Sequence, residues 1–210
     1  MTSPTPPAEP TYADRVYRSP GGIAGGVLLL ALGLWLAGDA IVRGHGSAPW
    51  LALAGLLCGV PLVFAFTVRP AVFAGDDRLR VRNPFRTVTL PWAAVADVRA
   101  GYSSEVFDQD GTKYQLWSVP VSLRRRKRAN RAQVRSAATD PYGRTSATAG
   151  ADEASRLAPA DRTIRELREL AERNSGREGA QGGVSVRWAY EVIAPAVAGA
   201  VVLAVLLAVG

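Results

Sequence analysis

The stretch RLRVRNPFRTVTLPW, residues 78–92, contains two short segments in which apolar and polar residues alternate. Leu79 and Val81 alternate with three arginines in the first segment, and Val88 and Leu90 alternate with threonines in the second. Such alternation places the apolar side chains on one face of a strand and the polar side chains on the other. The Asn-Pro-Phe sequence between the two segments is typical of a turn. The stretch therefore predicts two strands of a sheet that has one buried face.

Further short segments of the same kind lie on both sides of this stretch. They cover residues 71–74, 95–100, 105–108 and 112–119, and the last two read as a hairpin around the Asp-Gln-Asp-Gly turn at 108–111. Several short strands separated by turn residues are typical of a small antiparallel sheet or barrel. We therefore predict a small antiparallel β domain over residues 70–123.

Three long apolar segments flank this domain, at residues 21–42, 49–68 and 188–210. Each has about the 20 residues that an α-helix needs to cross roughly 30 Å of hydrocarbon. The short connection between the first two segments predicts a helical hairpin. The first segment does not fit a signal peptide, because the apolar core of a signal peptide usually has only about 7 to 15 residues and this segment is longer. We predict an α+β membrane protein with three transmembrane helices, in which the β domain lies between the second and the third.

The β domain also carries motifs that can be compared with a known family. Directly after the two-helix hairpin come Gly-Asp-Asp at 75–77, the stretch at 79–92, Asp-Gln-Asp-Gly at 108–111 and Leu-Trp-Ser-Val at 116–119. In these motifs the domain resembles the bacterial PH domains of actinobacterial membrane proteins, specifically the low molecular weight protein antigen 6 PH-domain family. The resemblance implies a PH-like fold of two near-orthogonal sheets that a C-terminal helix usually closes. It implies no catalytic residue.

No predicted helix follows directly after residue 123, so we expect either an abbreviated barrel or one closed by a later helix. Residues 1–20 are predicted to be a flexible N-terminus, residues 124–160 a basic and then flexible linker, and residues 161–175 an amphipathic helix. Ile164, Leu167 and Leu170 share one face of this helix. Because a helix of about four turns is marginal alone, this face must rest on the PH-like sheet, a partner or a second copy.

A basic cluster at the start of the linker carries the whole excess charge of the chain. The formal net charge is +7, and the cluster contains seven basic residues and no acid: Arg124, Arg125, Arg126, Lys127, Arg128, Arg131 and Arg135. Near an anionic leaflet, each such charge can contribute about 1 kcal/mol to membrane docking. A solvated run that only fixes the membrane topology explains the cluster equally well. Nucleic acid is not an expected partner, because the run has no interleaved aromatic residue for base stacking.

The arginines at 78, 80 and 82 form a second basic feature. Their placement is similar to that of the headgroup-binding residues of eukaryotic PH domains. We interpret them instead as the wetted face of a half-buried strand, because any such strand shows polar residues with a period of two.

Lys and Arg near the ends of the spans predict the orientation. Basic residues precede the first span, follow the second and precede the third, whereas the link between the first two spans contains only Arg43. We predict a multi-pass protein of the cell membrane with the N-terminus and the PH-like domain in the cytoplasm and the C-terminus outside.

Small residues recur in the spans at the spacing that lets helices approach closely. They include Gly22 and Gly26, Gly55 and Gly59, and the ladder Ala196, Ala200, Ala204 and Ala208. Packing of the three helices within one chain is favoured over a dimer face, and the oligomeric state stays open. Asp39 and Glu191 are expected at opposite faces of the bilayer, which argues against a shared ion-relay site.

The residues offer no catalytic, cofactor-binding or metal site. His45 is the single histidine and lies in the short helical link, while the single cysteine, Cys58, lies within an apolar span. The Asp-Gln-Asp-Gly turn lacks calcium ligands where Val106 and Trp117 stand. We therefore predict that the protein is not an enzyme.

Two functional hypotheses follow. In the first, the PH-like domain is a non-catalytic binding module for protein partners or for anionic lipid headgroups of the membrane surface. Protein partners would contact the PH-like domain or the helix at 161–175. In the second, the chain is a structural or accessory subunit of a membrane complex, and its helices form the main interface in the lipid bilayer.

Overall fold

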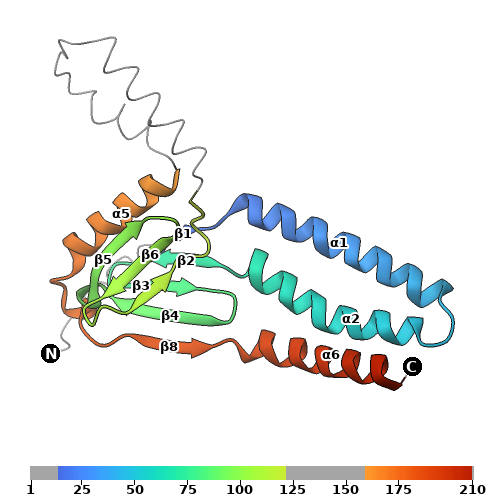
Figure 1. Ribbon diagram of the computed structural model, residues 1–210. Helices are drawn as coiled ribbons and strands as arrows, with labels where there is room; N and C mark the ends of the chain where they lie inside the picture. Colours follow the sequence, from blue (N-terminus) through green and yellow to red (C-terminus); the bar gives the residue numbers. More distant parts are fainter. Residues whose placement is uncertain (1–13, 122–158, 210) are drawn as a thin grey trace, which may run out of the picture.

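The computed structural model describes residues 14–121 and 159–209, which form a two-sheet α+β domain at one end of a layer of three helices (Figure 1). The sheets are antiparallel, the domain is PH-like, and the three helices are long and apolar enough to cross a membrane. This confirms the predicted fold class.

The first sheet has five strands in the order β1-β2-β3-β4-β8. Their bounds are β1 (Arg15–Tyr17), β2 (Ala71–Ala74), β3 (Arg78–Arg82), β4 (Arg86–Pro91) and β8 (Ser185–Trp188). Leu79 pairs with Leu90 and Val81 with Val88, so the apolar residues of the opening stretch do share one buried face. The arginines of β3 lie on the opposite, outer face of this sheet.

Both edge strands come from segments in which no strand was expected. β1 lies within the N-terminal segment that was expected to be flexible, and β8 lies just before the third span. Strands of three and four residues show no readable alternation, and pairing with β2 and β4 stabilises them instead. Arg15 of β1 also forms an ion pair with Glu166.

The second sheet has the order β5-β6-β7, with β5 (Val95–Ala100), β6 (Ser104–Asp108) and β7 (Lys113–Gln115). A 3-10 turn, η2 (Trp92–Ala94), connects the two sheets. In the β6–β7 turn, Asp108 accepts hydrogen bonds from Thr112 N at 2.7 Å and from Tyr114 Oη at 3.0 Å. Gly111 has a φ of +80° there. The carboxylate therefore stabilises a hairpin turn.

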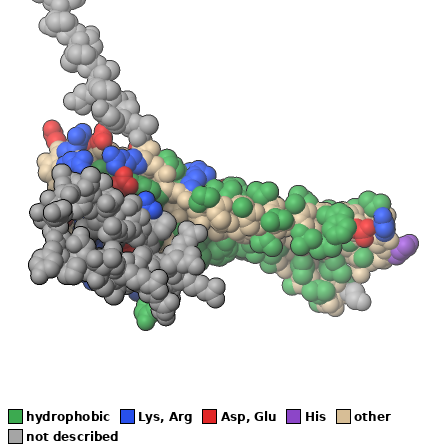
Figure 2. All heavy atoms as spheres, turned by 90° about the horizontal axis from the view of Figure 1, so that it is seen from above, with side chains coloured by type: hydrophobic (Ala, Val, Ile, Leu, Met, Phe, Trp, Pro, Cys, Tyr) green, Lys and Arg blue, Asp and Glu red, His purple; other side chains and the backbone are tan. Residues whose placement is uncertain are grey.

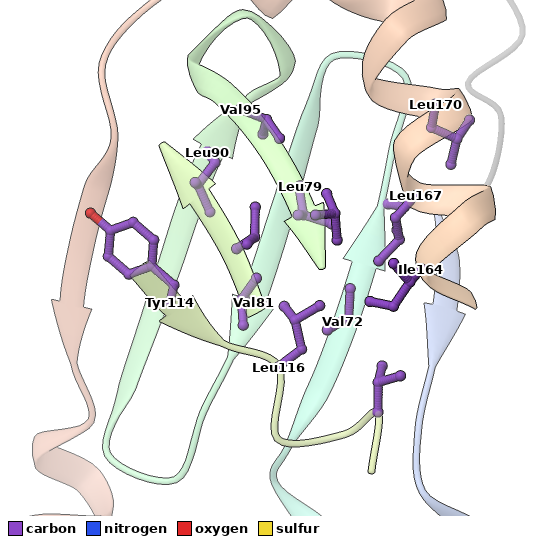
Figure 3. Packing of buried hydrophobic residues seen from close by; sticks show 14 of the residues in the cluster. Val72, Leu79, Val81, Leu90, Val95, Tyr114, Leu116, Ile164, Leu167 and Leu170 are labelled. Carbon is purple, nitrogen blue, oxygen red and sulfur yellow. The ribbon is translucent and has the colours of Figure 1, made fainter. Parts of the chain in front are cut away.

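The core lies between the two sheets and the helix α5 (Pro159–Asn174), as Figure 3 shows. Leu79, Leu90 and Trp92 are fully buried, and Leu167 of α5 is fully buried against them. Ile164 and Leu170 point from the helix toward the same core. The apolar face of the helix therefore rests on its own domain.

The helical layer consists of α1 (Pro20–Arg43), α2 (Ala48–Val63) with its π-helical extension η1 (Phe64–Val68), and α6 (Tyr190–Val209). α2 contacts α1 on one side and α6 on the other, so it is the middle helix (Figure 1). Hydrophobic side chains cover most of the face of this layer that Figure 2 shows, and charged side chains gather toward its ends. Such a surface suits a lipid environment.

Close helix contacts use only part of the predicted small-residue pattern. A Cβ on Gly26 would lie 2.0 Å from Thr67 Oγ1, and one on Gly199 would lie 2.4 Å from the backbone nitrogen of Cys58. The buried residues of α6 are Val192, Ala196 and Gly199, and α6 packs on α2 at Gly199. The other members of the alanine ladder, Ala200, Ala204 and Ala208, are exposed. The reason is that a four-residue spacing drifts off one face of a helix with 3.6 residues per turn.

Candidate functional site: an arginine-lined pocket beside the spans

The pairing of β3, β4 and β8 builds a row of polar residues across the outer face of the first sheet. Arg82 lies opposite Thr87, and Thr87 lies opposite Arg187. Residues opposite each other in an antiparallel sheet project to the same face. The row therefore places Thr87 between two arginines.

An open pocket of about 430 Å³ lies where this outer face meets the ends of η1 and α6. Its polar lining comes from the sheet and the helix ends: Arg69, Arg80, Arg82, Thr87, Thr89, Arg187 and Glu191. Its apolar lining is Phe64, Trp188 and Val192. The lining of the pocket thus combines basic side chains with apolar ones.

Arg69 connects the β3–β4 turn to the start of α6. Its side chain is only 8% exposed, and it donates hydrogen bonds to the backbone oxygen of Asn83 and, at 3.1 Å, to Glu191 Oε1. The backbone nitrogen of Ala189 donates to the oxygen of Phe85 at 2.8 Å. The β3–β4 turn is therefore held between the end of one span and the start of another.

Aromatic side chains reinforce this contact. The Phe66 ring of η1 packs edge-on against Phe85 of the β3–β4 turn, with centroids 5.2 Å apart, and against Trp117, at 5.5 Å. Such pairs contribute about 0.5 to 1.5 kcal/mol beyond the burial of their area. The PH-like domain therefore sits directly on the helical layer.

The charges of the pocket are unevenly balanced. Arg69 pairs with Glu191, and Arg80 pairs with Asp14 at 3.0 Å. Among residues 14–121 and 159–209, neither Arg82 nor Arg187 has an ion-pair partner. Burial, followed by the neighbouring charges of Arg69, Arg18 and Arg80, lowers the pKa of Arg82 below its ordinary value. An anion in the pocket would relieve this crowding of positive charge.

Phe73 orients two of these arginines. The guanidinium groups of Arg80 and Arg82 lie 5.1 Å and 5.4 Å from the centroid of its ring. Stacking on an aromatic face restrains a guanidinium while leaving its N–H donors available at the edge. The pocket is therefore partly preorganised for an anionic group.

The basic residues that the sequence analysis identified overlap only in part with the residues that line the pocket. The basic cluster formed by Arg124, Arg125, Arg126, Lys127, Arg128, Arg131 and Arg135 lies outside the described residues. Arg80 and Arg82 were interpreted as part of a wetted strand face; they do lie on the outer face of the sheet, and there both line the open pocket. Arg69, which follows the second predicted span, and Arg187, which precedes the third, are among the basic residues that the sequence analysis used only to predict the orientation. Arginine alternation in β3 was the available signal, but the pairing of β8 with β4 was needed to complete the row.

Glu191 and Asp39 each have an arginine partner. Glu191 pairs with Arg69 across the junction, and Asp39 pairs at 3.1 Å with Arg43, one helical turn away. Within the described parts of the chain, no group of His, Cys, Asp and Glu residues could hold a metal ion. The guanidinium and hydroxyl groups that line the pocket can bind an anion.

Comparison with known proteins gives a family match for part of the chain. No curated protein and no solved structure matched the chain. The comparison with family models matched residues 69–144 to the bacterial PH domain. β1, α5 and β8 lie outside this match, although they complete the first sheet and cover the core. The segment that follows α2 is thus similar to the bacterial PH domain family, in agreement with its PH-like fold.

Proposed function

We propose that this multi-pass membrane protein uses its PH-like domain as a non-catalytic module that binds the anionic surface of its own membrane. The observation that carries the proposal is the basic pocket at the end of the domain that adjoins the spans. PH domains are in general binding modules, and the match indicates no catalytic family. Membership of the actinobacterial low molecular weight protein antigen 6 family is part of this proposal.

Two features support a cytoplasmic location for the domain. β1, which precedes α1, pairs with β2, which follows η1, so both lie at the same end of the helical layer. The same end holds most of the basic residues near the spans, as expected for the cytoplasmic side. We therefore place the N-terminus and the domain in the cytoplasm and the carboxyl end of α6 outside.

The pocket arginines lie close enough to the ends of the spans to be attracted by an anionic leaflet. Attraction to an anionic leaflet is worth about 1 kcal/mol per basic residue and falls off within a Debye length of about 8 Å at physiological salt. Arg69, Arg82 and Arg187 line a pocket that also includes side chains of the span ends. The basic cluster at 124–135 would add to this attraction wherever it comes near the leaflet.

Protein partners are a weaker alternative for the described surfaces. α5 offers no free apolar face, because Ile164, Leu167 and Leu170 are buried in the core of the domain. At Gly21 and Gly25 of α1, an added Cβ would meet no atom of another element within 4 Å, so these small-residue positions are open. They favour the second hypothesis, that of an accessory subunit whose helices pack on a membrane partner.

Spin-labelled lipids test the membrane-surface proposal on the full chain. In bilayers of phosphatidylcholine, electron spin resonance gives the relative association of labelled phosphatidylglycerol and labelled phosphatidylcholine with the protein. We expect phosphatidylglycerol to be preferred several-fold at low salt, and the preference to shrink as the salt concentration rises. Equal association of the two lipids at low salt would contradict the proposal and would leave the accessory-subunit hypothesis.

A further inference from the structure

We propose that the pocket between the outer face of the first sheet and the ends of η1 and α6 holds the phosphate of one anionic glycerophospholipid. This inference rests on the proposed function, because its ligand is a lipid of the membrane that the domain adjoins. It goes further by assigning one stoichiometric site to Arg82, Thr87 and Arg187, in place of diffuse attraction.

The spacing of Arg82, Thr87 and Arg187 across three strands sets the size of the phosphate site. Neighbouring strands lie about 4.8 Å apart, so the Cα atoms of Arg82 and Arg187, two strands apart, are separated by roughly 10 Å. Guanidinium groups that reach inward from both sides can bind phosphate oxygens bidentately. The hydroxyl of Thr87, between them, can donate to a third oxygen.

The charges favour an anion over a cation. Four arginines line the pocket, and its single carboxylate, Glu191, is already paired with Arg69. Neither Arg82 nor Arg187 forms an ion pair in the described part of the chain, although the charge of Glu191 acts on both. A phosphate would therefore give ion pairs to two arginines that form none with the described side chains.

The apolar part of the pocket lining favours a lipid over a free anion. Phe64, Trp188 and Val192 belong to the ends of the spans or to the strand that leads into α6. An inorganic phosphate or a sugar phosphate would leave these apolar side chains uncovered. A glycerol backbone would cover them, and its acyl chains would pass directly into the hydrocarbon beside α6. A volume of about 430 Å³ lies in the usual range for small-molecule sites, roughly 300 to 1,000 Å³.

Native mass spectrometry of the full chain in detergent measures such a site. The protein is titrated separately with phosphatidylglycerol, phosphatidylcholine, glycerol 3-phosphate and inorganic phosphate. We expect one phosphatidylglycerol to be retained, with the other three at least tenfold weaker. Equal binding of phosphatidylcholine, or effective competition by inorganic phosphate, would overturn the lipid assignment.

Matched variants locate the site. The pair Arg82→Gln and Arg187→Gln removes two charges from the pocket, and the pair Arg78→Gln and Arg173→Gln removes two exposed charges outside it. We expect the first pair to weaken phosphatidylglycerol at least tenfold and the second to have less than a twofold effect. Equal losses would overturn the pocket while leaving the general preference for anionic lipid, and so the proposed function, intact.

A third variant blocks the pocket sterically without removing a charge. Thr87→Phe fills the middle of the row without changing any charge, so it should also reduce lipid retention at least tenfold. Unchanged melting of the full chain, followed by tryptophan fluorescence, shows that a variant is folded. Full retention by a folded Thr87→Phe protein would contradict the assigned position. If the full chain retains one phosphatidylglycerol in the mass spectra but shows no preference for spin-labelled phosphatidylglycerol in bilayers, the proposed function is refuted and the lipid site is not.

Discussion

Asp97 shows how a single side chain can connect two elements of the domain. It accepts a hydrogen bond from Arg99 within β5, and it lies 3.4 Å from the guanidinium of Arg168 on α5. Arg168 also donates to the backbone oxygen of Val98 at 2.6 Å. The hydrogen bond from Arg99 is the main cause that lowers the pKa of Asp97, with the backbone N–H of Val98 and the charge of Arg168 adding to it against the opposing effect of burial.

This lowered pKa predicts a pH dependence. Because the folded value lies below the unfolded value of about 3.9, the stabilisation is complete above that pH and is lost as the pH falls through the folded value. Asp97→Asn should lower the free energy of unfolding by roughly 0.5 to 1 kcal/mol at neutral pH. Melting of both proteins between neutral pH and about pH 3 checks this, and the difference should shrink at the acidic end. A constant difference would show that the charge is unimportant.

The arginine pocket illustrates what residue patterns could and could not predict. Alternation in residues 78–82 placed the arginines of β3 on one face, and the structure has them there. Arg69, Arg187 and Glu191 come from three separate segments, and only the sheet pairing and the helix ends bring them together. Local periodicity contains no information about such long-range contacts, so the sequence predicted a polar strand face but not the pocket that the face helps to form.

At the scale of elements, the strands with clear alternation were readable and the edge strands were not. β3 and β4 have buried faces that the sequence pattern describes correctly. β8 is exposed at all four positions and runs into an apolar span, so its sequence does not separate it from the helix. Its place in the sheet depends on pairing with β4, which lies almost a hundred residues earlier.

α5 provides the prediction at this scale. Leu167 is fully buried between the helix and the sheets, and truncation to alanine would leave a cavity (Figure 3). We expect Leu167→Ala to destabilise the domain by about 2 to 5 kcal/mol and to accelerate hydrogen exchange in α5 and β5. Arg173→Ala, at an exposed position of the same helix, is the control and should change exchange little. Equal effects of the two variants would mean that the helix is not docked through this face.

At the scale of the whole molecule, the β3–β4 turn joins the domain to the helical layer. The turn contacts Phe66 through Phe85, receives a hydrogen bond from Ala189, and is bound by the buried Arg69. Contacts of three different kinds at one junction restrict rotation of the domain relative to the spans. The domain and the helices should therefore move as one body.

Phe85→Ala tests this rigidity. Loss of the edge-on ring contact should weaken the junction by about 1 kcal/mol, and hydrogen exchange should rise in the β3–β4 turn and at the start of α6 while α5 stays protected. Tyr102→Ala, in the exposed β5–β6 turn, removes an aromatic ring elsewhere in the domain and should leave both regions unchanged. Faster exchange throughout the domain in Phe85→Ala would instead indicate a general loss of stability.

The direct passage from β8 into α6 also has a consequence for synthesis of the protein. The ribosome releases β2, β3 and β4 long before β8, so the edge of β4 has no partner while the intervening segment is being translated. An unpaired edge is a site of wrong association between chains. A nascent chain that stops before Ser185 would keep that edge open and would lack the third span. Completion of the sheet is therefore coupled in time to delivery of α6 into the bilayer.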